Sequence, residues 1–161
     1  MILIKNGRLI NPNTNVDEIT DVLIEKNKII KIKKNIDIKN VVNTIDATKC
    51  IISPGLIDIH VHFREPGFKY KEDIQSGSRS AARGGFTTVV CMANTNPVVD
   101  NEETFNYIKK KAEQSIINVL QTSAITKGLK GEELVDMVYL KGAGAVGFTD
   151  DGIPILDSGI V

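Results

Sequence analysis

The chain has 161 residues, of which 42% are apolar and 25% are charged, a composition typical of a globular protein rather than a disordered one. Its 20 lysines and arginines balance 20 aspartates and glutamates, so no global charge favours binding to nucleic acid or to an acidic membrane. No run approaches the roughly 18 apolar residues of a membrane span, and the N-terminus lacks the pattern of a signal peptide, so we expect a cytoplasmic protein without a membrane partner.

Residues 1–53 are predicted to form a small β domain. Short apolar runs at 2–4, 8–10, 21–24, 28–32, 41–46 and 50–52 alternate with turn residues. The pairs Asn6-Gly7 and Lys26-Asn27 each predict a hairpin or bend between two runs. Because a small sheet is only marginally stable alone, we expect this domain to be one part of a composite β-sandwich.

After Pro54-Gly55 the pattern changes to strands that alternate with helices. Strands are predicted at 56–62, 87–92, 116–120 and 145–149, and helices at 73–83, 102–115 and 132–141. This order predicts right-handed βαβ crossovers and a parallel sheet, so the fold class is α/β. Cys50 and Cys91 form no C-x-x-C pair, and core packing is the role expected of both.

Polar residues follow each predicted strand of this second region. His60 and His62 end the first strand, Asn94 follows the second, Ser123 the third, and Asp150-Asp151 the fourth. Each taken alone has an ordinary structural explanation, such as turn formation or capping. Their repeated position at the carboxyl ends of parallel strands predicts one shared site.

The chain's two histidines are two residues apart in Asp58-Ile59-His60-Val61-His62, so alternation would place Asp58, His60 and His62 on one face of a strand. Two imidazoles about 7 Å apart along a strand can converge on one cation. Together with a carboxylate from Asp150 or Asp151 they make a ligand set suited to zinc.

Arg64 lies two residues beyond His62 and offers a planar fork for a substrate carboxylate. The alternative is a surface arginine paired with Glu65 or Asp73. Asn94 could donate to the same anion, or simply form a turn.

Residues 54–67 (PGLIDIHVHFREPG) resemble the metal-binding signature of the dihydroorotases, within the amidohydrolase superfamily. The resemblance continues through 71–74 (KEDI), 84–89 (GGFTTV), 92–97 (MANTNP) and 148–152 (FTDDG). It covers essentially the whole chain and is closest to the longer bacterial type, which is similar to the allantoinases and dihydropyrimidinases.

The resemblance implies a reversible cyclisation of N-carbamoyl-L-aspartate to L-dihydroorotate and water in de novo pyrimidine biosynthesis, by zinc-activated hydroxide. It implies that His60, His62 and Asp151 bind one or two zinc ions, and that His62, Arg64 and Asn94 bind the substrate. Residues 54–161 would form the first four or so units of a (β/α)8 TIM-type barrel, preceded by the small β-sandwich domain of residues 1–53. We also expect the protein to form a homo-oligomer and to associate with aspartate transcarbamoylase.

The chain departs from the family pattern in having no third histidine. The later ligands and the proton-carrying aspartate are expected beyond Val161, and the isolated chain is expected to be inactive and unstable. Two other functions stay open: a non-catalytic dihydroorotase-like scaffold, and a hydantoinase-like or allantoinase-like cyclic amidase. Arg64 distinguishes a dihydroorotase from such a cyclic amidase, because a substrate without a carboxylate gives this arginine no anion to bind.

Overall fold

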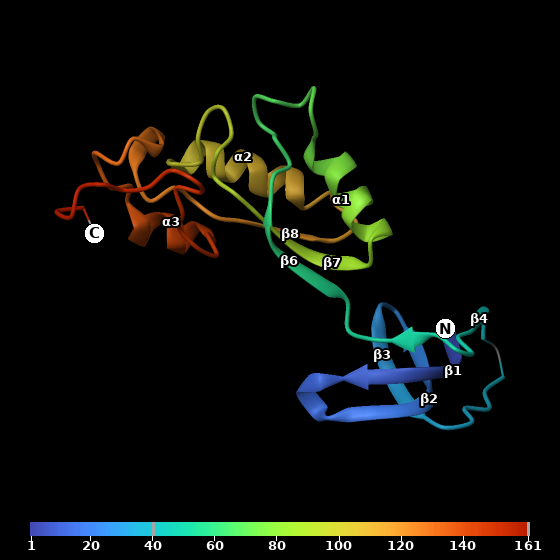
Figure 1. The fold of residues 1–161 in the computed structure, drawn as a ribbon. Helices are drawn as coiled ribbons and strands as arrows, with labels where there is room; N and C mark the ends of the chain where they lie inside the picture. The colour runs from blue at the N-terminus through green and yellow to red at the C-terminus, as the bar shows by residue number, and fades with distance from the viewer. Residues whose placement is uncertain (40, 161) are drawn as a thin grey trace. The chain divides into compact units, whose positions relative to one another are not determined.

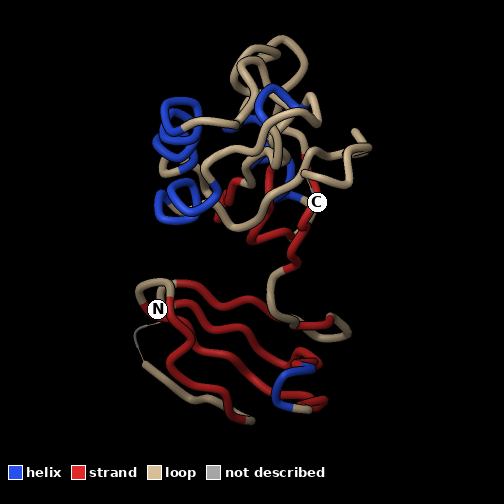
Figure 2. Tube along the Cα trace, turned by 90° about the vertical axis from the view of Figure 1, so that its left-hand side faces the viewer, coloured by secondary structure: helices blue, strands red, loops and turns tan. Residues whose placement is uncertain are grey.

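A computed structural model describes residues 1–39 and 41–160, and the chain divides into two compact units, Met1–Pro54 and Gly55–Val161. Figures 1 and 2 show the elements of each unit. The first unit contains β1 (Ile2–Asn11), the 3-10 turn η1 (Pro12–Thr14), β2 (Val16–Glu25), β3 (Lys28–Lys33), β4 (Asn43–Asp46) and β5 (Ile51–Ile52).

The first unit is one mixed sheet with the strand order β3-β2-β1-β4, and β5 also pairs with β1. The β1–β2 and β2–β3 pairs are antiparallel, whereas β4 and β5 run parallel to β1. Leu3, Leu23 and Ile36 form its buried apolar cluster. Large apolar side chains such as Ile19 and Ile29 are exposed, so the sheet buries only part of its apolar residues.

The two predicted turns of this unit have different outcomes. Lys26 and Asn27 both have positive φ, 47° and 63°, and connect β2 to β3, so the second hairpin is confirmed. Of the hairpin or bend predicted at Asn6-Gly7, the hairpin is wrong, because β1 continues through both residues; its pairing with β2 shifts register between Ile4 and Gly7. Asn6, at φ 63°, adopts the left-handed conformation of a bulge rather than reversing the chain.

The second unit is built on three parallel strands in the order β6-β7-β8, as predicted for an α/β chain. Its elements are β6 (Leu56–Val61), α1 (Ile74–Arg83), β7 (Phe86–Cys91), α2 (Glu102–Ala112), β8 (Asn118–Gln121), the 3-10 turn η2 (Lys127–Leu129) and α3 (Met137–Ala143). The helix predicted at 73–83 is confirmed. Asp73 caps it through a reciprocal pair of hydrogen bonds with Ser76, and it ends at Gly84.

Helices α1 and α2 cover the same face of this sheet in both views (Figures 1 and 2). Val89 and Cys91 of β7 are buried in the core together with Ile74 of α1 and Phe105 of α2. Burial raises the pKa of the Cys91 thiol to about 12, so it packs as a neutral, largely apolar group. The core role predicted for Cys91 is confirmed, but Cys50 is exposed, so the same prediction for that residue is wrong.

Two predicted elements of the second unit differ from the structure. The predicted helix at 132–141 begins only at Met137, because Leu134 makes a β-bridge to Thr126 and Asp136 caps α3. Residues 145–149 form no regular strand, but Ser123 and Phe148 make a parallel bridge beyond β8. Across the residues that the structure describes, no helix is long and apolar enough to cross a membrane.

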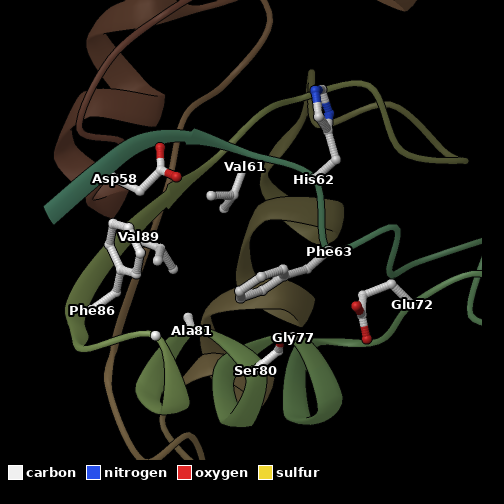
Figure 3. Close-up of a pocket in the computed structure, with 11 residues that line it drawn as sticks. Asp58, Val61, His62, Phe63, Glu72, Gly77, Ser80, Ala81, Phe86 and Val89 are labelled. Carbon is white, nitrogen blue, oxygen red and sulfur yellow. The ribbon is translucent and has the colours of Figure 1, made fainter. Parts of the chain in front are cut away.

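The residue after His62 is anchored in the core. Phe63 and Val61 lie toward α1, whereas the His62 ring points the other way (Figure 3). Phe63 packs on Gly77 so closely that a Cβ added to this glycine would lie 2.4 Å from the phenylalanine Cδ1. The chain that carries His62 is therefore held by a contact between a loop and a helix.

Replacing Gly77 by alanine tests this contact. We expect Gly77→Ala to lower the free energy of unfolding by about 1–3 kcal/mol, because the methyl group displaces Phe63 from a close-packed site. The matched control is Gly142→Ala in α3, where no atom lies within 4 Å of the added Cβ. That variant should be neutral, or more stable by up to about 1 kcal/mol, through helix propensity alone. Urea unfolding of both variants measures the difference, and equal midpoints would contradict it.

Candidate metal centre

The two histidines converge at the carboxyl end of β6. Their ring centroids are 5.2 Å apart and the ring planes make an angle of 65°. The side chain of His60 is 57% exposed and that of His62 is 26% exposed, so the pair lies at an accessible edge. Asp58 does not join them: its carboxylate accepts a hydrogen bond from the backbone N–H of His60 at 3.0 Å. Strict alternation fails here because the β6–β7 register shifts between Asp58 and Val61.

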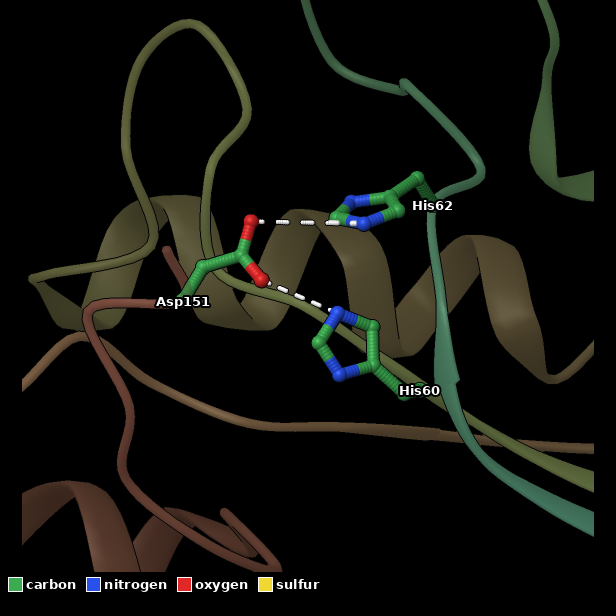
Figure 4. Close-up of side chains that lie close together, drawn as sticks. All are labelled: His60, His62 and Asp151. Atoms are coloured by element: carbon green, nitrogen blue, oxygen red, sulfur yellow. Dashed lines mark ion pairs between the residues drawn. The ribbon is translucent and has the colours of Figure 1, made fainter. Parts of the chain in front are cut away.

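Asp151 completes the group from the other end of this unit's sequence (Figure 4). Its Oδ1 lies 2.9 Å from Nε2 of His60, and its Oδ2 lies 4.0 Å from Nε2 of His62. One ligand atom from each residue falls within 4.8 Å of the others. Two imidazole nitrogens and a carboxylate oxygen at this spacing fit the donor set of a zinc ion.

The adjacent Asp150 faces the opposite way and is 3% exposed. Its Oδ1 accepts hydrogen bonds from the backbone N–H groups of Ile125 at 2.7 Å and Thr126 at 3.1 Å. Its Oδ2 accepts a third from the Thr126 hydroxyl at 2.5 Å. Asp150 thereby ties the loop after β8 to the segment that carries Asp151. Chemistry alone left Asp150 and Asp151 as alternatives and the resemblance implied Asp151; the structure places Asp151, and not Asp150, beside the histidines.

Asn94, which follows β7, contacts two members of the group. Its Nδ2 donates to Oδ2 of Asp151 at 2.5 Å, and its Oδ1 lies 3.0 Å from Nδ1 of His62. A carboxylate only accepts hydrogen bonds, so the amide nitrogen must face Asp151 and the amide oxygen must face His62. That oxygen needs a donor, which puts the proton of neutral His62 on Nδ1. The lone pair of Nε2 is then free for a cation.

Arg64 lies just beyond the histidines, half-buried and with φ at 59°. Neither alternative partner engages it: Glu65 pairs with Lys69, and Asp73 caps α1. Within residues 1–39 and 41–160 its guanidinium makes no hydrogen bond or ion pair. Among the described residues the charge of Arg64 therefore has no partner, which leaves it available to an anion.

Two contacts at this site were not anticipated from the sequence. The anchoring role of Asp150 and the orientation of His62 by Asn94 both depend on partners at least 24 residues away in the chain. For the anchoring role of Asp150, the sequence offered one signal, the pair Asp150-Asp151. Adjacent carboxylates point to different sides when the backbone turns between them. The orientation of His62 by Asn94 had no local signal.

Comparisons with known proteins find chains that are similar to this one. A family model described as dihydro-orotase-like matches residues 49–161. The dihydroorotase of Clostridioides difficile (strain 630) is 61% identical over 161 residues, which is 100% of this chain and 38% of that protein. The dihydroorotase of Clostridium acetobutylicum is 58% identical with the same coverage. Among solved structures, an L-hydantoinase from Arthrobacter aurescens superposes with a TM-score of 0.75 at 27% identity, covering 91% of this chain and 32% of that one.

The parallel α/β sheet and this structural likeness place the chain in the fold class of the hydantoinases. Within that class, the family model covers most of the sequence, including every residue of the candidate metal centre. The chain belongs to the dihydroorotase-like family. It spans 38% of the length of the curated relatives named here.

The two aspartates should respond differently to the same substitution. In the complete polypeptide that the gene encodes, Asp151→Ala should weaken zinc binding at least about 10-fold, because a direct ligand contributes more than the outer contacts that carry 10- to 100-fold effects. Asp150→Ala should instead lower the free energy of unfolding by about 1–3 kcal/mol, because it leaves buried donors without an acceptor. Competition with a chromophoric chelator and urea unfolding measure the two quantities. Loss of zinc affinity in Asp150→Ala and loss of stability in Asp151→Ala would show that the roles of the two aspartates are reversed.

Asn94→Ala should also weaken zinc binding, by about 10-fold, because it removes the contact that fixes the His62 tautomer. Asn96→Ala is the matched control, since Asn96 is exposed in the same turn. The same chelator competition reports both variants. Equal zinc affinity in the two would rule out the orienting role.

Proposed function

We propose that this chain contributes the metal ligands and the substrate-anion site of a dihydroorotase. That enzyme interconverts N-carbamoyl-L-aspartate and L-dihydroorotate plus water, in de novo pyrimidine biosynthesis. The observation that carries the proposal is the convergence of His60, His62 and Asp151 within 4.8 Å, in a chain 61% identical to a dihydroorotase. Arg64, two residues from the histidines, supplies the positive charge that a dicarboxylate substrate requires.

Zinc is the metal that we infer for this group, as one or two ions. Nε2 of His60, Nε2 of His62 and the Asp151 carboxylate would hold it, and the open edge at His60 leaves room for substrate. When bound, zinc polarises a carbonyl oxygen and promotes loss of a proton from water near neutral pH. Asn94 keeps the His62 ring in the tautomer that ligation needs.

On the substrate side, Arg64 and Asn94 would bind a carboxylate, with His62 beside them. A guanidinium donates two parallel hydrogen bonds to one carboxylate, which fixes the orientation of the substrate as well as holding it. One N–H of the Asn94 amide already contacts Asp151, so a bound anion would accept from the second N–H of the same nitrogen. Arg64 is the residue that decides substrate class, because hydrolysis of a cyclic amide without a carboxylate gives it no partner.

The same proposal includes the architecture of the whole protein. We propose that residues 54–161 form the first four or so units of a (β/α)8 barrel and that residues 1–53 form part of a β-sandwich. Three parallel strands with helices on one face support the first, and the exposed isoleucines of the small sheet support the second. Oligomerisation, association with aspartate transcarbamoylase and a cytoplasmic location stay predictions from the sequence.

Substituting Arg64 tests the proposed function. In the complete gene product, Arg64→Met should raise KM for carbamoyl aspartate about 10- to 100-fold, because a charge-assisted hydrogen-bond pair is worth roughly 1.5–3 kcal/mol. Arg79→Met on the exposed surface of α1 is the control and should leave KM unchanged. Steady-state kinetics in both reaction directions measure the effect. An unaltered KM in Arg64→Met, or no turnover by the wild type, would refute the proposal.

A further inference from the structure

Glu65 is a buried carboxylate that the proposed reaction does not use. It is 5% exposed and lies in the loop that connects β6 to α1. Its Oε1 accepts from Nζ of Lys69 at 2.6 Å and from the hydroxyl of Tyr107 at 2.8 Å. Its Oε2 accepts from the backbone N–H of Ile74, the first residue of α1, at 3.1 Å. One carboxylate thus joins the loop to α1 and, through Tyr107, to α2.

The carboxylate is held in its ionised form. Burial alone would raise the pKa of Glu65, but hydrogen bonds from Lys69, Tyr107 and the Ile74 N–H, with the charge of Lys69, outweigh burial and hold this pKa below its ordinary value. A buried carboxylate whose oxygens are all engaged resists displacement, because each lost donor leaves a charge without compensation. These hydrogen bonds hold Glu65 in place within a loop that has no regular secondary structure.

Arg64 lies between two such anchors. Phe63 on one side is buried against Gly77, and Glu65 on the other side is fixed by its three donors. Arg64 itself has φ at 59°, a left-handed conformation that costs a residue with a Cβ about 1–2 kcal/mol. Such a conformation persists only where the neighbouring contacts determine it. The anchors therefore set the direction in which the guanidinium leaves the backbone.

We propose that Glu65 is a positioning residue, which holds the backbone of Arg64 in the conformation that presents its guanidinium to the substrate's carboxylate. This inference rests on the proposed function of Arg64. Glu65 does not touch the substrate. It restricts the conformations of the loop before the substrate binds, so that less conformational entropy is lost on binding. The metal ligands lie outside the Glu65 network, so zinc affinity should not depend on it.

Two variants of the complete gene product test the role. Glu65→Gln removes the charge, and Tyr107→Phe removes one donor while leaving the carboxylate in place. We expect each to raise KM for carbamoyl aspartate, by about 10-fold for Glu65→Gln and less for Tyr107→Phe, with kcat changed less than about 3-fold and zinc affinity unchanged. Glu113→Gln, at the exposed end of α2, is the control. Tyr107→Phe keeps the test informative should Glu65→Gln fail to fold.

A double-mutant cycle separates positioning from general destabilisation. If Glu65 acts through Arg64, then Glu65→Gln should have no further effect on KM when Arg64 is already methionine. An undiminished effect in that background would overturn the proposal.

Hydrogen exchange gives a readout that needs no substrate. The N–H of Phe68 donates to the carbonyl oxygen of Arg64 at 2.9 Å, so its exchange reports opening of this loop. It should be faster in both variants than in wild type or Glu113→Gln, and unchanged exchange would overturn the positioning role. Because turnover by the wild type is measured separately, failure of the proposed function and failure of this inference are distinguishable.

Discussion

The site depends on one carboxylate, that of Asp151, which lies between two imidazoles carried by a distant strand. The histidines come from the carboxyl end of β6, whereas the aspartate arrives only after β7, β8 and α3 have been added to the unit. Backbone hydrogen bonds between the Ser123 N–H and the Gly147 carbonyl, and between the Thr149 N–H and the Ser123 carbonyl, guide that last segment along the sheet. His60, His62 and Asp151 are therefore neighbours only because three parallel strands share one edge.

Around this group, three buried or part-buried polar side chains link loops to the rest of the unit. Asp150 holds the loop after β8, Asn94 links His62 to Asp151, and Glu65 links the β6–α1 loop to both helices. Each is satisfied by hydrogen bonds, which is what allows a polar group to remain buried. Precise placement of a few exposed side chains thus rests on several buried ones, because loops lack the regular backbone pairing that fixes a strand.

The likeness to a hydantoinase concerns the fold of this chain, whereas membership of the dihydroorotase-like family concerns its sequence. A shared fold accounts for the parallel sheet and its edge, and it does not select the substrate. Under the proposed function, substrate selection is local and rests on the charge of Arg64. The left-handed backbone of Arg64 lies between two anchored neighbours, Phe63 and Glu65, whose contacts allow such a conformation to persist.

The sequence by itself determined the parallel α/β pattern, the helix at 73–83 and the gathering of polar residues after successive strands, because periodicity and chain-breaking residues are local properties. It misplaced the Asn6-Gly7 turn and the start of α3, where long-range pairing overrides local preference. The resemblance implied Asp151 rather than Asp150, and only the tertiary structure gave the physical distinction between them. These neighbours have the same chemistry, and what distinguishes them is the Asp151 backbone at φ 57° and the donors that Thr126 brings from elsewhere in the chain.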